Sequence, residues 1–369
     1  MPITHINKPT PTVAMGLFDD VLKEGESLIR NENALDYEFL PKLLPFRERE
    51  QEAIARAIAP LLQGRNGRNI FIHGPPGIGK TAAVRHVLKE LEEEHDEAYA
   101  IYINCWQTDT SYKVYLEMCD QLGFKFTQNK NTSELLKVVA SIINKKAAVI
   151  VFDEIDKAAE FDFLYSLIQE LLKKSIILIT NYKSWLAELD ERIKSRLTPE
   201  LLAFKEYTGS QTLEILRQRR DYAFPPGVWD TEAFSLVAQR ATAAKDIRTG
   251  LFLMREAAAK AEAVASKKIT LDHVKQAIAG MDEFTIKNSQ DLKEDERAIY
   301  DIVKAHSGKK IGDLYKLYKK AGGEVSYKTF QRKIAALDEG NFVTLERQTG
   351  EGGNTTIVHR KTTTKLTEF

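Results

Sequence analysis

The stretch NIFIHGPPGIGKT, residues 69–81, runs from an apolar segment into a glycine-rich loop. Residues 69–73 predict a short buried strand, and residues 74–81 fit the GxxxxGK-Ser/Thr phosphate loop. Glycines permit backbone angles that other residues avoid, so successive N–H groups can turn towards phosphate oxygens. A glycine turn that only resembles the motif is the alternative. We predict an ATP- or ADP-binding loop made of Gly74, Pro75, Pro76, Gly77, Ile78, Gly79, Lys80 and Thr81.

Two side chains of this loop have separate expected roles. Lys80 would reach the β and γ phosphates, and the hydroxyl of Thr81 would ligate Mg²⁺. The helix expected from residue 82 to residue 93 would present its positive N-terminal end to the same phosphates. The cofactors predicted by the loop are therefore ATP or ADP together with Mg²⁺.

The surrounding sequence predicts an α/β domain. Apolar strands are expected at AYAIYIN (98–104), AAVIVFD (147–153), SIILITN (175–181) and LLAFKEY (201–207), with helical segments before all but the last. Strands that are apolar throughout and separated by helices indicate a parallel sheet covered on both faces. Ligands of such sheets bind beyond the carboxyl ends of the strands. The phosphate loop falls at that edge.

Three polar side chains also fall at this edge. Asp153 is expected to hold Mg²⁺, and Glu154 to orient and deprotonate the water that attacks the γ-phosphate. Asn181 would hydrogen-bond the γ-phosphate or that water. Acidic residues after a strand are also common helix caps, and an Asn there is a common turn residue. The complete phosphate loop upstream favours the catalytic interpretation for all three.

After the last strand the chain is helical to about Met281, which predicts a small helical bundle. Two arginines near or within it are candidates for contact with phosphate, because a planar guanidinium suits transition-state charge. Arg196 lies in a short helical segment, DERIKSRL, and Arg248 opens the third helix of the bundle. Spacing alone does not separate these roles from those of ordinary solvated arginines.

The last segment has the order of a winged helix: three short helices, then two strands around the turn QTGEGGN. In its third helix an apolar set should form the core: Tyr327, Phe330, Ile334 and Leu337. The opposite face should bind DNA, as in a recognition helix, through Lys328, Thr329 and Arg332. The glycine-rich turn could enter a minor groove with Arg347, Gln348 and Asn354. Winged helices also bind proteins, which is the alternative.

Charge and composition set the expected partners. The 369 residues carry 53 basic and 53 acidic side chains, but from Lys304 to Lys365 there are 13 Lys and Arg against 6 Asp and Glu. A polyanion such as double-stranded DNA is therefore expected at this end. Two isolated cysteines and the lack of an apolar signal or membrane-spanning run predict a cytoplasmic, nucleoid-associated protein with no membrane partner.

Taken together, these motifs resemble an AAA+ ATPase, and more narrowly the archaeal initiators related to the origin recognition complex and its helicase-loading partner. The resemblance spans residues 16–360 and is carried by PFRERE, NCWQTDTSYKVYLEMCDQLG, DEID and the winged-helix tail. It implies a helical lid over the nucleotide. It also implies that Arg196, in SRL, is an arginine finger acting on a neighbour's ATP, and that Arg248, in KDIR, is the lid sensor.

The same resemblance implies that Tyr207 and Arg219, a pair spaced by twelve residues, border the nucleotide. Two features depart from the family pattern. Lys245 stands where the family usually has Gly, and the insertion that touches DNA in the family is short here, with Lys125 and Lys130 as its obvious cations.

We therefore expect five segments: a flexible tail (1–15), the α/β nucleotide-binding domain (16–206), the lid (207–283), a linker (284–292) and the winged helix (293–369). The expected function is that of an ATP-binding DNA replication initiator that recognises origin duplex and recruits or loads the replicative helicase, as a homo- or hetero-oligomer on DNA. Slow ATP hydrolysis would act as a switch. The alternatives are a branch-migration motor, a nucleotide-gated transcription regulator and a protein-interaction platform.

Overall fold

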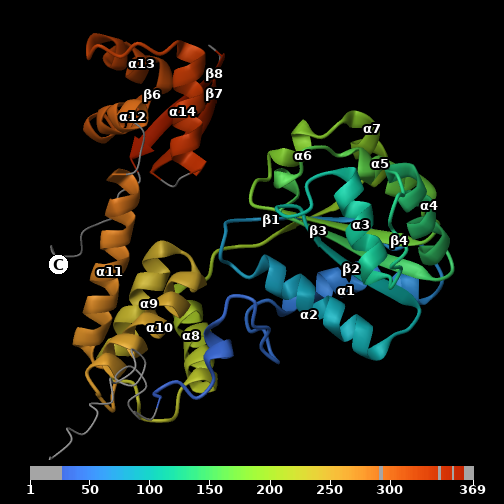
Figure 1. Ribbon diagram of the computed structural model, residues 1–369, viewed down its shortest axis with the longest axis horizontal. Coiled ribbons are helices and arrows are strands. Elements are labelled where there is room, and N and C mark those ends of the chain that lie inside the picture. The colour runs from blue at the N-terminus through green and yellow to red at the C-terminus, as the bar shows by residue number, and fades with distance from the viewer. Residues whose placement is uncertain (1–26, 291–293, 340–341, 351–352, 361–369) are drawn as a thin grey trace, which may run out of the picture. The chain divides into compact units, whose positions relative to one another are not determined.

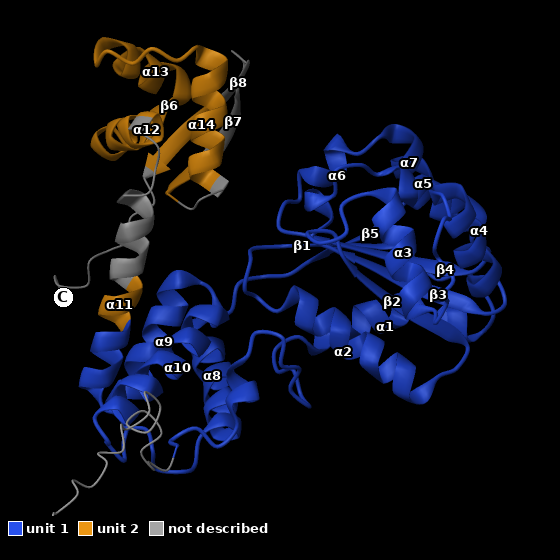
Figure 2. Ribbon diagram, viewed as in Figure 1, with its two compact units in different colours: residues 1–277 blue, residues 278–369 orange. Residues whose placement is uncertain are grey.

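A five-stranded parallel sheet carries the phosphate loop. Its strands, in the order β2-β3-β4-β1-β5, are Ala98–Asn104, Ala147–Asp153, Lys174–Thr180, Ile70–His73 and Glu200–Ala203. The computed structural model describes residues 27–290, 294–339, 342–350 and 353–360, and forms two compact units, residues 1–277 and 278–369 (Figures 1 and 2). The predicted parallel sheet is confirmed.

Alternate residues along the strands pack into two cores, one on each face of the sheet. In β3, Val149 and Val151 pack with α1 (Glu48–Leu62) and α2 (Lys80–Glu94). Ile150 and Phe152 point to the other face, which is covered by α3 (Ser111–Gln121), α4 (Thr132–Ile143) and α5 (Asp162–Glu170). Two short helices, α6 (Trp185–Glu188) and α7 (Glu191–Leu197), extend that layer. Burial on both faces explains why β3 and β4, in the middle of the sheet, consist mostly of apolar residues.

The lid is a bundle of α8 (Gly209–Ala223), α9 (Thr231–Ala244), α10 (Ile247–Ala263) and the start of α11 (Leu271–Gln290). The segment before the sheet, residues 27–39, also packs on this lid, whereas we expected residues 16–206 to belong to the α/β domain. The N–H groups of Arg30 and Asn31 both donate to the carbonyl of Ala223 at the end of α8 (2.7 and 3.1 Å). A short 3-10 helix, η1 (Glu32–Leu35), contacts α8 and α10. Residues 27–39 therefore belong to the lid by their contacts.

The second unit has the element order of a winged helix. Its helices α12 (Glu294–Ala305), α13 (Ile311–Lys320) and α14 (Tyr327–Glu339) pack on an antiparallel sheet of order β6-β8-β7, formed by Lys309–Lys310, Gly353–Arg360 and Val343–Gly350. Phe330, Ile334 and Leu337 are buried, as predicted. Tyr327 was expected in the core but is 39% exposed, and its ring makes a T-shaped contact with that of Tyr315 at the border of the core.

Two further differences concern the ends of the predicted segments. Helix α11 continues to Gln290, so most of the linker predicted at 284–292 is helical. The tail predicted at 1–15 lies outside the described residues. Within the described ranges, no helix is long and apolar enough to span a membrane.

Lys245 takes a conformation that suits glycine. It ends α9 with a φ of 55°, in the left-handed region that costs an L-residue about 1–2 kcal/mol. Its ammonium lies 3.0 Å from Glu206, and both side chains are largely exposed, so this ion pair contributes little. The departure from the family's Gly at this position therefore carries a conformational cost.

We predict that Lys245→Gly is more stable than Lys245→Ala by about 1 kcal/mol in free energy of unfolding, measured by urea denaturation. Both variants lose the pair with Glu206, so their difference isolates the backbone term. Equal stabilities of the two variants would show that the left-handed conformation at Lys245 carries no such cost.

Candidate functional site

The phosphate loop joins β1 to α2 through three glycines with positive φ. Gly77 and Gly79 have φ of 71° and 85°, and the last two residues of the loop motif, Lys80 and Thr81, form the start of α2. A side chain at Gly77 would also collide with the lid, since a Cβ added there would overlap the carboxylate of Asp246. The glycines thus set the loop's path and let the lid approach it.

Lys80 is buried and held in place by three oxygen acceptors. Its Nζ donates to the carbonyls of Gly74 and Pro75 and to Oδ1 of Asn181, each at 2.7 Å. Burial lowers the pKa of Lys80 to about 8, although nearby Asp153 acts in the opposite direction. The structure therefore brings Lys80 and Asn181 together, as expected for residues that share the γ-phosphate.

Asp153 lies at the carboxyl end of β3, next to the loop. Its Oδ2 accepts hydrogen bonds from the hydroxyls of Thr81 (2.6 Å) and Tyr102 (2.7 Å), and its Oδ1 accepts from the N–H of Glu154 (2.8 Å). A hydroxyl and a carboxylate in contact are hard oxygen donors that fit Mg²⁺, which commonly binds one or two protein ligands together with substrate phosphates. Thr81 and Asp153 are therefore the residues that would hold this ion.

Glu154 follows Asp153 in a left-handed conformation, with a φ of 51°. For a residue with a Cβ this backbone is strained, and such strain is often found at functional sites. Burial, followed by the proximity of Asp153, raises the pKa of Glu154 above its ordinary value. A raised carboxylate pKa favours proton acceptance from water, which agrees with the predicted role of a general base.

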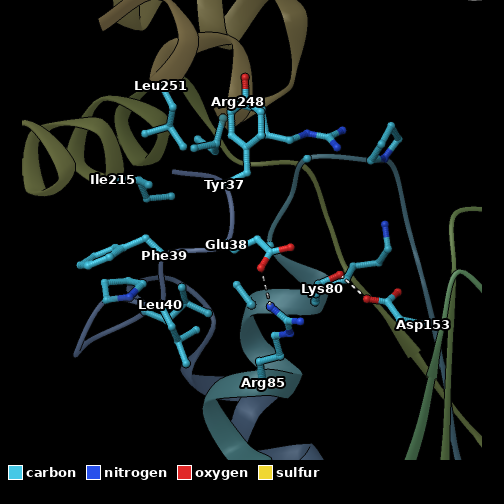
Figure 3. Close-up of a pocket in the computed structure, with 18 of the residues that line it drawn as sticks. Tyr37, Glu38, Phe39, Leu40, Lys80, Arg85, Asp153, Ile215, Arg248 and Leu251 are labelled. Atoms are coloured by element: carbon cyan, nitrogen blue, oxygen red, sulfur yellow. Dashed lines mark hydrogen bonds and ion pairs between the residues drawn. The ribbon is translucent and has the colours of Figure 1, made fainter. Parts of the chain in front are cut away.

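One pocket of about 310 Å³ collects most of the predicted nucleotide site. Its apolar wall comes from the segment before the sheet, with Tyr37, Phe39 and Leu40, and from the lid, with Ile215 and Leu251 (Figure 3). The predicted residues that line this pocket are Pro76, Gly77, Gly79, Lys80, Thr81, Asp153, Glu154, Asn181, Tyr207, Arg219 and Arg248. Polar groups for phosphates and an apolar wall for a base thus face the same space.

Gly74, Pro75 and Ile78 were predicted to bind nucleotide but do not line the pocket. The first two orient Lys80 through their carbonyls. The side chain of Ile78 is buried in the core beneath the loop. Their role in the structure is to shape the loop.

The lid arginines are both paired within the protein. Arg248 opens α10 and forms an ion pair with Asp246 (2.9 Å), whose carboxylate packs on Gly77. Arg219 is buried and donates to the carbonyls of Ala34 (3.3 Å) and Phe39 (2.8 Å). Burial lowers the pKa of Arg219 to about 10. Arg219 therefore borders the pocket by fixing the segment that forms its apolar wall.

Arg196 does not line this pocket. It is exposed on α7, with its guanidinium 4.8 Å from the ring centre of Tyr165. An arginine finger acts on the site of a neighbouring subunit, so a position away from its own pocket is compatible with that role.

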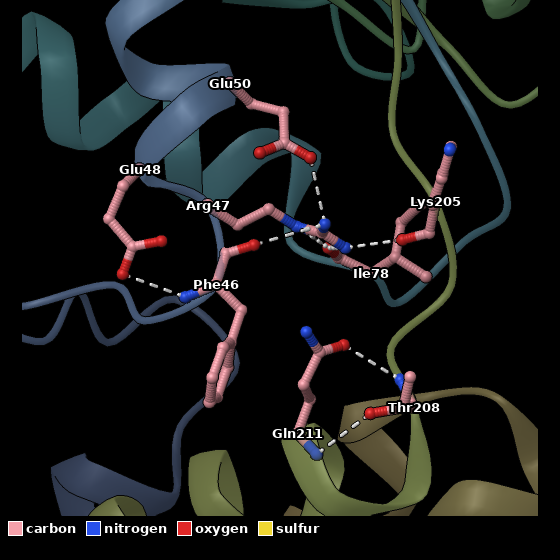
Figure 4. Close-up of polar contacts among 8 residues, drawn as sticks. All are labelled: Phe46, Arg47, Glu48, Glu50, Ile78, Lys205, Thr208 and Gln211. Atoms are coloured by element: carbon pink, nitrogen blue, oxygen red, sulfur yellow. Dashed lines mark hydrogen bonds and ion pairs between the residues drawn. The ribbon is translucent and has the colours of Figure 1, made fainter.

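Arg47 was not predicted as a site residue, although PFRERE was part of the resemblance. Its buried guanidinium donates to the carbonyl of Ile78 in the phosphate loop (2.9 Å) and to that of Lys205 before the lid (2.7 Å), as Figure 4 shows. It also stacks on the ring of Tyr207, 3.9 Å from the ring centre. Apart from that resemblance, the sequence shows only a charged residue at the start of an amphipathic helix, and such residues are usually exposed.

The predicted DNA-binding residues lie in the second unit. Lys328 and Arg332 are exposed on α14, and Thr329 is half-buried with its hydroxyl 3.0 Å from that of Ser326. Three others belong to the hairpin: Arg347 and Gln348 in β7, and Asn354 in β8. The side chains of these three lie outside what the structure describes.

We predict that nucleotide binding at about pH 8.5 takes up roughly half a proton or more. Lys80 is then mostly neutral in the free protein, and phosphate oxygens favour its charged form, so binding raises its pKa and affinity falls as pH rises above about 8. The phosphate's own second pKa, about 6, is too low to interfere. Calorimetry in two buffers of different ionisation enthalpy measures the uptake.

The control for this experiment is Lys80→Arg, because a guanidinium stays charged at this pH. Proton uptake should vanish in that variant. Identical binding enthalpies of the wild type in both buffers would contradict the assignment.

Comparisons with known proteins agree with this geometry. Residues 43–179 match the AAA ATPase domain family, and residues 213–279 match the Cdc6 AAA+ ATPase-type lid domain. The chain is 31% identical to ORC1-type DNA replication protein 1 of Archaeoglobus fulgidus, over 88% of this chain and 84% of that protein. It is 34% identical to the protein of the same name from Sulfurisphaera tokodaii, over 71% and 69%.

Among solved structures, the Aeropyrum pernix ORC1 protein in complex with DNA is similar, with a TM-score of 0.69 and 28% identity. The match covers 91% of this chain and 94% of that one. The chain is therefore a member of the archaeal ORC1-type DNA replication protein family, with an AAA+ ATPase domain and a Cdc6-type lid.

Proposed function

We propose that this protein is an ATP-dependent replication initiator that binds origin duplex DNA and recruits or loads the replicative helicase. The observation that carries the proposal is the likeness over 91% of the chain to an ORC1 protein solved in complex with DNA. Membership of a family of DNA replication proteins supports it. In this proposal the protein works in the cytoplasm on the nucleoid, as a homo- or hetero-oligomer on DNA.

The nucleotide would lie between the α/β domain and the lid, with Mg²⁺ held by Thr81 and Asp153. When bound, the ion neutralises phosphate charge in the transition state. Lys80 and Asn181 would hold the γ-phosphate, since they are close enough to each other to share a hydrogen bond. Glu154 would orient the attacking water and accept its proton. Each of these side chains lines the same pocket.

Nucleotide state would act as a switch through the lid. Arg248 is paired with Asp246, and a γ-phosphate offers its guanidinium a second anionic partner. The lid angle would then differ between ATP and ADP states, and with it the joint grip of the α/β domain and the winged helix on DNA. Slow hydrolysis suits such a switch, because the arginine finger comes from another subunit.

Duplex DNA would be bound by α14, where Lys328 and Arg332 are exposed. We expect genome-wide occupancy of the wild type to peak sharply at replication start sites, and these peaks to disappear in Lys328→Ala with Arg332→Ala. In vitro the double variant should lower the slope of log affinity against log salt by about 2, one for each lost phosphate contact.

The matched control is Lys316→Ala with Lys320→Ala, which removes the same charge from exposed positions on α13. If both double variants bind DNA equally well, α14 is not the DNA-binding helix. Wild-type peaks at promoters rather than replication start sites would favour a transcription regulator, and diffuse occupancy a non-specific motor.

Arg196 is tested by complementation between subunits. We expect Arg196→Ala alone and Lys80→Ala alone to lose hydrolysis, the former by about 10³-fold or more, and a mixture of the two to regain part of it. In the mixture, the Lys80→Ala subunit supplies Arg196 to its partner's intact pocket. Phosphate release measures the outcome.

Arg192→Ala is the control, because Arg192 lies on the same helix but forms an ion pair with Asp190 (2.9 Å). It should hydrolyse ATP like the wild type. Full turnover by Arg196→Ala alone would remove the finger assignment.

A further inference from the structure

A tyrosine hydroxyl lies inside the predicted Mg²⁺ site without being one of its expected ligands. Tyr102 is on β2, which pairs with β3 in parallel so that Asn104 is opposite Asp153. The long phenol side chain spans this diagonal, and its hydroxyl donates to Oδ2 of Asp153 at 2.7 Å. Tyr102 also lines the nucleotide pocket.

Two of the hydrogen bonds to Asp153 come from a predicted Mg²⁺ ligand and from the adjacent backbone. The Thr81 hydroxyl also donates to Oδ2, but Thr81 is itself expected to ligate the ion. The N–H of Glu154 donates to Oδ1 and moves with the backbone of Asp153. Tyr102 is therefore the side chain that reaches Asp153 from another strand without being expected to bind Mg²⁺.

The tyrosine ring is itself fixed. The guanidinium of Arg85, on α2, lies 4.5 Å from the ring centre of Tyr102. Arg85 in turn is 3.8 Å from Glu38, in the segment that forms the apolar wall of the pocket (Figure 3). The phenol thus has little freedom to leave the carboxylate.

We propose that Tyr102 is a positioning residue that holds the Asp153 carboxylate in the orientation required for Mg²⁺. This rests on the proposed binding of ATP with Mg²⁺. Mg²⁺ demands nearly ideal octahedral geometry, so a small rotation of a carboxylate ligand weakens its binding. Partners that orient metal ligands typically contribute 10- to 100-fold in metal affinity.

The test is Tyr102→Phe, which removes only the hydroxyl and keeps the ring under Arg85. Binding of a fluorescent ATP analogue is measured in EDTA and then as Mg²⁺ is added, without relying on turnover. We expect the Mg²⁺ concentration that produces half of the change in analogue binding to rise about 10- to 100-fold. Affinity for the analogue in EDTA and the melting temperature should stay close to those of the wild type.

The control is Tyr99→Phe, on the same strand but away from Asp153, with its ring beside Lys146. It should leave the Mg²⁺ midpoint unchanged. The proposal is overturned if Tyr102→Phe also leaves the midpoint unchanged, or if it weakens binding equally with and without Mg²⁺, which would indicate a structural role. If the wild type binds the analogue but does not respond to Mg²⁺, both the Mg²⁺ assignment and this proposal are wrong. If the wild type does not bind the analogue at all, the proposed function itself is wrong.

Discussion

The buried guanidinium of Arg47 connects the parts of the chain that surround the nucleotide pocket. It binds the carbonyl of Ile78 in the phosphate loop and that of Lys205, just before the lid, while its face covers Tyr207. A buried cation is stable only when its donors are satisfied, so these carbonyls must stay close to it. The phosphate loop and the start of the lid are thereby held to the same side chain.

Further contacts extend this connection across the pocket. Arg219 fixes the segment around Phe39 to the lid, and Asp246 of the lid packs on Gly77 of the loop. The pocket therefore has walls from both the α/β domain and the lid. A ligand that fills it would contact both, which is the physical basis for the proposed nucleotide-dependent lid angle. The same segment is connected to the proposed Mg²⁺ site through Glu38, Arg85 and Tyr102.

Local patterns were enough to predict the sheet and the loop. The strand Ala98–Asn104 has the bounds read from its apolar run, and Lys80, Asn181 and Asp153 meet because parallel strands end at one edge. Long-range contacts could not be predicted in this way. Nothing in the local sequence distinguishes Arg47 from an exposed helix residue, or shows that Tyr102 reaches Asp153. The packing of residues 27–39 on the lid, and the pairing of Arg219 with their carbonyls, likewise depend on segments 180–185 residues apart.

The most direct test of a nucleotide-dependent grip on DNA is the affinity and nuclease footprint of one protein in two nucleotide states. The variant Glu154→Gln should bind ATP without hydrolysing it. Its affinity for the best genomic DNA site, and its footprint there, are measured once in ATP and once in ADP. We expect affinity and the length of the footprint to differ between the two states, because in the proposed switch the γ-phosphate would change the contacts of the lid. Identical affinity and footprint in both states would contradict this mechanism.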